Sequence, residues 1–476
     1  MKDGTHSIAS PLSTCFGKHK ILWLNLVGGF VVGLDRVCPI AAVACLDDGL
    51  EYDFVENRSG LRFLSRERKT GKRIRTPDPC TDEIIPALRD EIDNTMERHP
   101  AADWIFVCPR GSRTLEDFAC KRGKKAVCPP SVLYDWLYDK ANFFSGLEAA
   151  GLPRLPGRWL RAKNARFAEL RSTFGLPFVV QTARSQSGAG TSLIRRESDL
   201  AAVFANLADS ELWIAPFAGP LSLNINAFAM DSWIAVGYPN IQLVGLDMVG
   251  ARPFSGYCGN DYTSVAGLPC EIVQEAQDQT ERLGRWLISL GYRGIFGLDF
   301  VMQQGSGKLF PVDLNPRWQG STVLETQAML RAGRIPLAAA EIAYTTGSMS
   351  ESDIAPFLDD FRAPIAGSQL YLAYVGPGEA RIDRHVSPGI YVSVQQLEFR
   401  RPGLELADCA TEEEVLLCGG IVRPGTCLVP GSRPARVASL GAMVNPETLA
   451  PLPWTRRVVS KVYEAIGLTP PRDETW

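Results

Sequence analysis

The stretch GLDFVMQQGSGKLFPVDLNPRWQGST, residues 297–322, contains two strand-like runs on either side of a glycine-rich turn. Alternate residues of a strand project from the same face, so Asp313, Asn315 and Arg317 share one face of the second run. If the two runs pair through QQGSGK, Asp299 lies on that face as well. The stretch therefore predicts two antiparallel strands with a cluster of polar side chains on one face.

Three oxygen-bearing side chains, those of Asp299, Asp313 and Asn315, would converge in this cluster. They suit Mg²⁺ better than Zn²⁺, because Mg²⁺ is commonly held by one or two carboxylates together with water and substrate phosphates. Arg317, next on the same face, could bind a phosphate or a carboxylate through two parallel hydrogen bonds. A hairpin with solvated polar residues is the alternative, but it accounts less well for the apolar residues around them.

A second polar segment, QTARSQSGAGTS at residues 181–192, follows the apolar run FVV. Gly188 and Gly190 permit backbone amides to approach phosphate oxygens, and Ser187 and Thr191 add hydroxyl donors. The segment is not a P-loop, since the pattern GxxxxGK[ST] does not occur. Taken alone, the segment is equally compatible with a surface turn.

Length and composition predict a soluble globular enzyme of two to four domains or subdomains, with 476 residues, 45% hydrophobic and 22% charged. The 50 Lys and Arg residues nearly balance the 53 Asp and Glu residues, so nothing attracts the whole chain to nucleic acid or a membrane. The 12 cysteines are scattered without a CxxC pair and only 4 His residues occur, which argues against a zinc site and a disulfide framework. We expect a reducing, cytoplasmic location.

The segment KHKILWLNLVGGFVVGL, residues 18–34, has basic residues before an apolar run, as a signal peptide does. Asn25 and the pair Gly28–Gly29 interrupt the run, and it is too short to span a bilayer. We expect instead a buried first strand that turns at the two glycines.

Four regions are expected along the chain. Short apolar runs alternate with helix-like stretches in residues 1–130, which predicts an α/β domain with a mostly parallel sheet. Residues 131–215 and 216–350 are expected to form the two halves of an α+β unit that carries both polar segments. Residues 351–476, rich in turns and short strands, are expected to form a small β-rich cap.

The order of these features is distinctive: Asp139–Lys140 before a helix, a Gly/Ser loop between strands, a hinge strand, and then Asp…Asp-x-Asn-x-Arg. This order resembles the ATP-grasp superfamily of carboxylate–amine ligases over roughly residues 130–345. The resemblance implies an ATP-grasp fold, in which two α+β subdomains clamp ATP behind an N-terminal α/β domain. It also implies a reaction in which a carboxylate is phosphorylated by ATP and an amine then displaces phosphate from the acyl phosphate.

The resemblance assigns a role to each candidate residue. Asp299, Asp313 and Asn315 would bind Mg²⁺, and Arg317 would contact a phosphate or the acyl group. Lys140 stands where the family's first phosphate-contacting Lys falls. The loop from Ser187 to Thr191 would close over the γ-phosphate, and the hinge from Ala215 to Phe217 would hold adenine.

Three positions depart from the family pattern. Gln181 stands where a second Lys is usual and supplies no charge. The hinge reads APF without the usual Glu, so the backbone of Ala215 and Phe217 would have to pair with adenine. A further Glu is replaced in LSLNIN, where Ser222 or Asn224 would take its part. Such divergence resembles the ATP-grasp ligases of peptide and natural-product biosynthesis.

Two further segments have competing interpretations. PFSGYCGNDYTS, residues 253–264, is expected to be a loop in which Tyr257, Asn260 and Asp261 hold the amine, or else a simple Asx-type turn. The basic segment RERKTGKRIR, residues 66–75, has no interleaved aromatic residues, so a solvated turn or hairpin is favoured over nucleic-acid binding.

The sequence thus predicts an ATP- and Mg²⁺-dependent ligase that joins a small carboxylate, an amino acid or peptide, to an amine. No nucleic-acid or membrane partner is expected, and a homodimer would be common for the family. The alternatives are other ATP-grasp chemistry, either phosphoryl transfer or carboxylation, and a non-catalytic nucleotide-binding protein.

Overall fold

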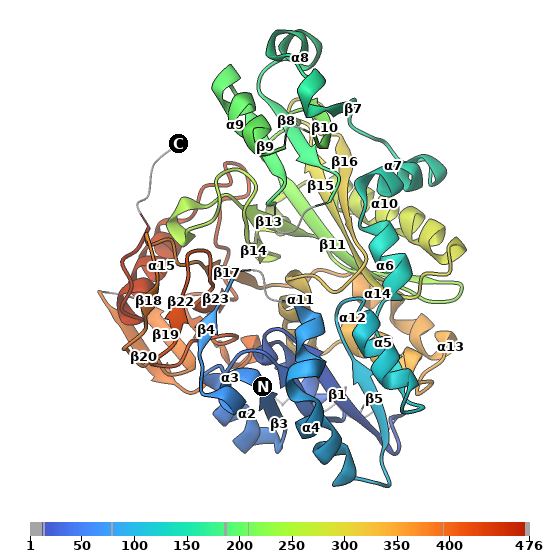
Figure 1. Cartoon of the computed structure of the whole chain (residues 1–476), viewed down its shortest axis with the longest axis vertical. Coiled ribbons are helices and arrows are strands. Elements are labelled where there is room, and N and C mark those ends of the chain that lie inside the picture. Colours follow the sequence, from blue (N-terminus) through green and yellow to red (C-terminus); the bar gives the residue numbers. More distant parts are fainter. Residues whose placement is uncertain are drawn as a thin grey trace.

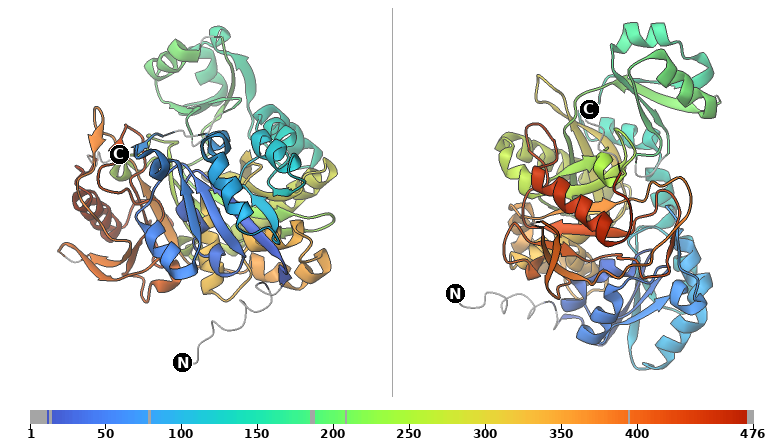
Figure 2. Two further views of the ribbon diagram at one scale, coloured as in Figure 1. Left: turned by 60° about the horizontal axis from the view of Figure 1, so that its bottom comes forward. Right: turned by 90° about the vertical axis from the view of Figure 1, so that its left-hand side faces the viewer.

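The computed structural model of the chain describes Leu12 and residues 15–77, 80–184, 188–207, 209–393 and 395–471. Figure 1 shows the N-terminal domain in blue, a small subdomain in green, and a larger part that runs from yellow to red. The small subdomain overhangs the rest of the molecule, as the right-hand view of Figure 2 makes clear. None of the helices within those ranges is both long and apolar enough to cross a membrane.

The N-terminal domain is built on parallel strands in the order β3-β2-β1-β5-β6. These strands are β1 (His19–Asn25), β2 (Ile40–Cys45), β3 (Arg62–Ser65), β5 (Asp103–Val107) and β6 (Lys125–Val127). The helices beside them are α2 (Glu51–Ser59), α3 (Arg66–Thr70), α4 (Ile84–Glu97) and α5 (Arg113–Cys120). Because β1 pairs with both β2 and β5, the strand order reverses between β1 and β5, where α/β folds place ligands. The predicted α/β fold with a parallel sheet is confirmed.

The small subdomain has a separate antiparallel sheet in the order β7-β10-β8-β9. Its strands are β7 (Arg158–Arg161), β8 (Phe178–Thr182), β9 (Thr191–Ile194) and β10 (Glu211–Pro216). Two helices, α8 (Phe167–Phe174) and α9 (Glu197–Leu207), complete it, and its buried residues form a hydrophobic cluster of their own. The helices α6 (Ser131–Leu137) and α7 (Lys140–Ala149) precede it in the chain. A separate core lets this subdomain hold its shape as a unit.

Eleven strands of the described chain form the largest sheet. One half contains β16 (Leu309–Asn315), β15 (Gly294–Met302), β11 (Ser222–Ala229), β12 (Ile234–Val236), β13 (Asn240–Val244) and β14 (Tyr257–Asp261). The other half contains β17 (Ser368–Leu372), β23 (Ala435–Ser439), β21 (Val415–Leu417), β19 (Gly389–Ser393) and β20 (Leu397–Arg401). The helices of this part are α10 (Cys270–Ser289), α11 (Ser321–Arg331), α12 (Leu337–Thr345), α13 (Glu351–Ile354), α14 (Leu358–Arg362) and α15 (Pro453–Ala465).

The strands of the predicted β-rich C-terminal region continue the large sheet. Strand β17 pairs with β14, and β17 in turn pairs with β23, so the predicted boundary at residue 350 falls within one continuous sheet. The segment expected to be a loop at residues 253–264 contributes β14 to the middle of that sheet. C-terminal side chains therefore belong to the same sheet as β15 and β16, the strands that carry Asp299 and Asp313.

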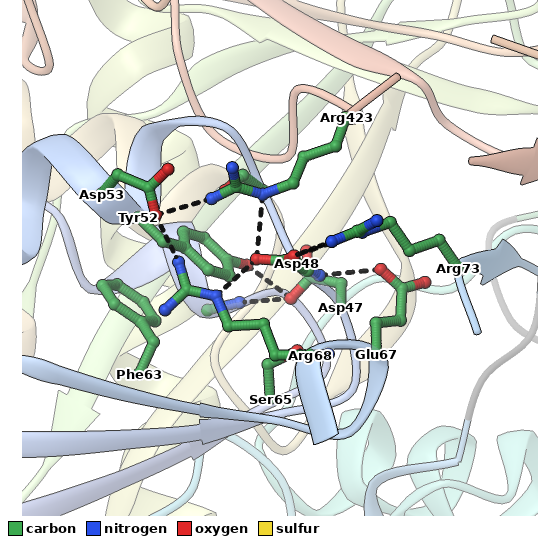
Figure 3. Close-up of polar contacts among 12 residues, drawn as sticks. Asp47, Asp48, Tyr52, Asp53, Phe63, Ser65, Glu67, Arg68, Arg73 and Arg423 are labelled. Atoms are coloured by element: carbon green, nitrogen blue, oxygen red, sulfur yellow. Dashed lines mark hydrogen bonds and ion pairs between the residues drawn. The ribbon is translucent and has the colours of Figure 1, made fainter. Parts of the chain in front are cut away.

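A cluster of charged side chains ties the C-terminal part to the N-terminal domain (Figure 3). Arg423 pairs with Asp48 at 3.0 Å and with Asp53 at 2.7 Å, and both acids belong to the N-terminal domain. Next to it, β22 (Cys427–Leu428) pairs with β4 (Ile74–Arg75). The two parts are thus joined by backbone and by ion pairs.

The basic segment 66–75 forms part of this cluster, which corrects the prediction of a solvated turn. Arg68 pairs with Asp48 at 2.6 Å, and the buried Arg75 pairs with Asp47 at 3.0 Å and Glu67 at 3.3 Å. Asp48 lies 20 residues from Arg68 and Asp47 lies 28 residues from Arg75 along the chain, so local charge patterning did not reveal these partners.

Candidate active site

A cavity of about 620 Å³ lies where the small subdomain, the large sheet and the N-terminal domain meet. The large sheet contributes Asp299, Asp313 and Asn315, and the small subdomain contributes Gln181 and Thr191. Residues at the carboxyl ends of the N-terminal strands also line it, which matches the point where the strand order reverses. The volume is that of a site for small molecules.

The two acids of the opening motif face each other across β15 and β16. Asp299 is the direct partner of Asp313 in the antiparallel register, and Asn315 pairs with Gly297 two residues along. Directly opposed residues of antiparallel strands project from the same face, so the carboxylates converge. The predicted pairing of the two strands is confirmed. Within the ranges described, no group of three or more His, Cys, Asp or Glu side chains could hold a metal, so any cation here depends on two carboxylates and amides.

Side-chain amides surround Asp299. Its carboxylate accepts hydrogen bonds from Asn224, from Gln242 at 3.2 Å, and from Asn315 and Gln319 at 3.4 Å each. Burial, together with the neighbouring Asp313 carboxylate, raises the pKa of Asp299 to about 6. Amide donors hold the carboxylate in place without neutralising it, which leaves its charge available for a cation.

Lys140 begins α7 and reaches the same cluster. Its ammonium forms an ion pair with Asp313, and the residue is buried although Asp313 is partly exposed. The side chain of Asp139 caps the helix by accepting from the Ala141 amide at 3.0 Å. The cap fixes where α7 starts, and so fixes where the Lys140 side chain enters the cavity.

Arg317 is positioned by the residues beside it. Its guanidinium donates to the Trp318 carbonyl at 2.9 Å and to the Asn315 side chain at 3.1 Å, both of which are neutral acceptors. Trp318 anchors the segment to the N-terminal domain, because its amide donates to the Pro109 carbonyl at 3.0 Å and its ring meets Trp23 edge-on at 5.1 Å. The positive charge of Arg317 is therefore held in place but not cancelled by these contacts.

The chain was compared with known proteins. No model of a protein family matches it. It is 22% identical over 326 residues to the carbamoyl phosphate synthase large chain of Thermoplasma acidophilum, a match that takes in 65% of this chain and 29% of that protein. The chain thus spans less than a third of the length of this relative.

Solved structures are similar over nearly the whole chain. Biotin carboxylase from Campylobacter jejuni, in complex with β-γ-ATP, gives a TM-score of 0.56 at 13% identity, covering 89% of this chain and 87% of that one. The biotin carboxylase domain dimer of the 2-oxoglutarate carboxylase of Hydrogenobacter thermophilus, with MgADP, ADP and bicarbonate, gives 0.55 at 13% identity, covering 89% and 86%. N5-carboxyaminoimidazole synthase from Aspergillus clavatus, with ADP and 5-aminoimidazole ribonucleotide, gives 0.53 at 12% identity, covering 93% and 97%.

This chain has the ATP-grasp fold. Its two halves are the small subdomain and the first half of the large sheet, and the cavity lies between them. The predicted ATP-grasp architecture, including the α/β domain in front of it, is confirmed.

The glycine-rich segment between β8 and β9 is hydrogen-bonded to the segment that precedes β14. Ser255 donates its hydroxyl to the carbonyl oxygens of Gly188 and Thr191, at 2.9 Å each. Gly188 has φ +76, and a Cβ placed there would meet the Ser255 carbonyl oxygen, so only glycine fits. Gly188 and Thr191 line the cavity, Gly190 lies in the same turn without lining it, and Ser187 lies outside the described residues.

The hinge end of the cavity is apolar. Ala215 lines it, and the Phe217 ring meets the Phe254 ring edge-on at 5.9 Å. The Phe217 amide donates to the Pro177 carbonyl at 3.3 Å. This amide is therefore already hydrogen-bonded, although the backbone of Phe217 was expected to pair with adenine. Phe254 has φ +67, and it and Leu449, at φ +58, are the non-glycine residues with positive φ in the described chain. Both line the cavity, where strained backbone is often found.

Polar residues that replace the usual charged ones lie around the middle of the cavity. Gln181 donates to the Thr191 hydroxyl at 3.2 Å, across the β8–β9 pair. Ser222 donates to the Gln242 side chain at 3.0 Å, and Asn224 supports Asp299 directly. All three predicted residues line the cavity, where Asn224 contacts Asp299 directly and Ser222 is linked to Asp299 through Gln242.

The three predicted amine-binding residues lie on β14, but only two of them line the cavity. Tyr257 and Asn260 line the cavity, and the Tyr257 hydroxyl donates to the Asn260 side chain. Asp261 does not: it is fully buried and accepts from Ser264 and from the Met443 and Val444 amides. We therefore remove Asp261 from the candidate ligands, because its carboxylate already accepts the hydrogen bonds that link β14 to the C-terminal part.

Several cavity residues were missed from the sequence. Gln319 continues the alternating series Asp313, Asn315 and Arg317, so the same periodicity could have found it. Arg110 follows β5 at the carboxyl end of a parallel strand, where ligands gather. No pattern in the sequence indicated that Arg433 would line the cavity, because the pairing of β23 with β17 brings it there.

Buried acids beneath the site make stability depend on pH. Burial raises the pKa of Glu325 to about 8 and of Glu341 and Glu51 to about 7, from ordinary values near 4.5. A folded-state pKa above the unfolded one gives stability that is present at low pH and lost as pH rises. We expect the free energy of unfolding to fall between about pH 4.5 and pH 8.

Replacing Glu325 with Gln should flatten this dependence. The Asn226 amide, which donates to Glu325 at 2.9 Å, keeps an acceptor in the variant. One titrating group contributes at most about 1.4 kcal/mol per pH unit, and that slope should be missing from the variant. Denaturant unfolding from pH 5 to pH 8.5 measures it. Parallel curves for the two proteins would contradict the prediction.

Proposed function

We propose that this protein is an ATP- and Mg²⁺-dependent ligase that activates a carboxylate as an acyl phosphate and transfers the acyl group to an amine. The observation that carries the proposal is the opposed pair Asp299 and Asp313 in a cavity whose other charged groups are cations. Among the described lining residues, these two carboxylates face six cations: Arg110, Lys140, Arg154, Arg195, Arg317 and Arg433. A triphosphate and a carboxylate repel each other, and Lys140, which pairs with Asp313, and Arg317, which contacts Asn315, favour binding both.

The donor set fits a divalent hard cation. Two carboxylates and the Asn315 amide oxygen are ligands of the kind that Mg²⁺ takes, with the remaining positions left for phosphate oxygens and water. Burial and the neighbouring Asp313 carboxylate raise the pKa of Asp299, and a cation bound between the two carboxylates would relieve their repulsion. When bound, Mg²⁺ would neutralise the β- and γ-phosphate oxygens during transfer.

The chain's own residues would orient the reactants. Lys140, which pairs with Asp313 here, would turn to a phosphate oxygen once a cation competes for that carboxylate. Arg317 would hold the carboxylate of the acid in line with the γ-phosphorus. A carboxylate oxygen then bonds to that phosphorus as the bond to the β–γ bridging oxygen breaks and ADP departs. The amine nitrogen next attacks the acyl carbon, phosphate leaves with the electron pair of the C–O bond, and the amine gives up a proton.

The acid is proposed to be an amino acid or a peptide. Gln181, the hinge APF and the neutral residues Ser222 and Asn224 depart from the usual pattern, and this divergence supports a specialised ligase of natural-product biosynthesis. That step rests on analogy between ATP-grasp enzymes. A cytoplasmic location, where ATP and Mg²⁺ are plentiful, belongs to the same proposal.

The test is an assay with ATP, Mg²⁺ and a panel of amino acids, peptides and small acids, with hydroxylamine as the amine. We expect ADP, phosphate and a hydroxamate with one class of acid. AMP and pyrophosphate would show adenylation and overturn the mechanism. Calorimetric titration with ATP and Mg²⁺ would show whether the nucleotide binds at all.

Carboxylation is the second candidate, because the similar solved structures include one with MgADP and bicarbonate. Bicarbonate would then be the carboxylate that ATP phosphorylates. The same assay separates the two candidates. ADP release that requires bicarbonate and no other acid would favour carboxylation.

The glycine loop gives a prediction of its own. Gly188→Ala places a Cβ against the Ser255 carbonyl and strains a residue with positive φ, at a cost of about 1–3 kcal/mol. We expect affinity for ATP and Mg²⁺ to fall by about 5- to 100-fold in calorimetric titration, because the loop must move. Gly175→Ala is the matched control, since Gly175 has φ +75 in the same subdomain with open space around it. Equal loss of affinity in both variants would refute the role of the Ser255 contact.

A further inference from the structure

An aromatic subsite lies at the end of the cavity next to Gly320. The aromatic subsite is defined by four residues that line the cavity: Phe30, Tyr257, Tyr371 and Arg433. Phe30 meets Tyr371 edge-on at 6.3 Å, and Tyr257 lies 6.0 Å from Tyr371. The N-terminal domain and both halves of the large sheet thus contribute one wall each.

Arg433 gives the subsite a positive charge that is not paired with a carboxylate of any described residue. Its guanidinium carbon lies 4.9 Å from the centre of the Tyr371 ring and 5.5 Å from that of Tyr257. It donates one hydrogen bond, to the Tyr257 carbonyl at 2.9 Å, and forms no ion pair with a carboxylate in the described part of the chain. The contacts with the two rings hold the guanidinium in place, and a guanidinium has five N–H donors, of which one is used here, so others remain for a carboxylate or phosphate.

The subsite touches the reaction centre through Gly320. The Gly320 carbonyl accepts from Tyr371 at 3.3 Å and from Gln369 at 2.8 Å, and Gly320 follows Arg317 by three residues. Asn260, which lines the cavity beside Tyr257, accepts from that tyrosine's hydroxyl. A molecule in the aromatic subsite would therefore have one end near the acyl carbon and the other near Arg433.

We infer that the aromatic subsite holds the amine substrate and that this amine carries an anionic group, a carboxylate or a phosphate, which binds Arg433. The inference rests on the proposed ligase function. It assigns the amine to the amino acids and related anionic amines, and excludes ammonia and simple alkylamines as preferred acceptors. Charge decides the assignment, because ATP, Mg²⁺ and the acid would occupy Lys140, Asp313 and Arg317 but leave Arg433 without a partner.

Pairs of amines that differ only in one anionic group test the inference. Phenylalanine is compared with phenethylamine and glycine with methylamine for the carboxylate, and phosphoethanolamine is compared with ethanolamine for the phosphate. Each competes with hydroxylamine for the acyl phosphate, with the amide product followed by mass spectrometry. We expect the anionic member of at least one pair to compete at a concentration at least about tenfold lower than its partner.

Arg433→Gln should abolish that preference and raise the competing concentration of the anionic amine at least about tenfold. Hydroxamate formation from hydroxylamine alone is measured for each protein, and the competing concentrations are compared relative to that rate. Arg381→Gln, an exposed arginine of the same C-terminal part outside the cavity, is the control and should change neither the preference nor the competing concentration. Equal competition by both members of every pair, or an unchanged preference in Arg433→Gln, would overturn the inference while leaving the ligase function standing.

Direct binding keeps the inference testable if no acid gives a hydroxamate. In the presence of Mg²⁺ and a non-hydrolysable ATP analogue, an anionic amine should raise the melting temperature more than its partner does, and Arg433→Gln should remove the difference. That outcome would support the subsite even if the ligase function failed. Equal shifts, or none, would overturn it.

Discussion

Replacing Asp313 with Asn is expected to abolish nucleotide turnover and leave the protein folded. The substitution removes one of two opposed carboxylates but keeps an oxygen that can accept from Lys140. We expect turnover to fall at least about 10³-fold, or about 4 kcal/mol, because a cation bound by a single carboxylate would be lost from the site. ADP release and calorimetric Mg²⁺ binding in the presence of ATP measure the effect.

The fold should survive because the Asp313 side chain is 35% exposed. Circular dichroism and the melting temperature check this directly. Asp209→Asn is the control, an exposed acid of the small subdomain away from the cavity. An Asp313→Asn protein that turned over ATP at the wild-type rate would show that the assigned metal site is wrong.

Arg75→Met is expected to have the largest effect on stability. Arg75 is buried with Asp47 and Glu67, and burial disfavours its charge while those acids more than compensate and raise its pKa above the ordinary value. Methionine fills much of the same volume but leaves two buried carboxylates unneutralised. Removing one partner of a buried ion pair costs about 3–5 kcal/mol.

Denaturant unfolding measures this change. Arg66→Met is the control, because Arg66 lies on the neighbouring helix α3 and pairs with Glu83 at the surface, where an ion pair contributes about 0–1 kcal/mol. Equal stability of the two variants would show that the ion pairs of Arg75 contribute no more to stability than a surface pair does.

The effect of Arg75→Met should reach the active site as well. Asp47 accepts from the Gly28 amide at 3.0 Å, and Gly28 begins the turn that carries Phe30 into the aromatic subsite. A destabilised cluster would therefore loosen one wall of that subsite.

The central motif was predictable because its geometry is local. Asp313, Asn315 and Arg317 alternate along one strand, and a short turn returns the chain so that Asp299 faces Asp313. No distant contact is needed to bring these four residues together. The parallel N-terminal sheet was predictable for a similar reason, since strands and helices alternate along the chain.

The errors arose where distant segments decide the outcome. The segment 253–264 reads as a polar loop, but pairing with β13 and β17 makes it strand β14. A register shift at Leu243 and Val244 brings Tyr257 and Asn260 to the cavity together, while Asp261 faces the other way. No pattern within the segment reveals that shift.

Arg433 and Tyr371 illustrate the same limit. Both lie in the region expected to be a small β-rich cap, and they reach the cavity because β17 and β23 extend the large sheet. Arg68 and Arg75 seemed solvated for the corresponding reason, since most of their counter-charges come from other elements.

The most direct test of the account follows oxygen atoms through the reaction. The acid that supports turnover is labelled with ¹⁸O in both carboxylate oxygens and incubated with ATP, Mg²⁺ and hydroxylamine. The account predicts one ¹⁸O in each inorganic phosphate released and none in the nucleotide, because the carboxylate oxygen bonds to the γ-phosphorus. Unlabelled phosphate, or label in AMP, would show that no acyl phosphate forms and would contradict the proposed function.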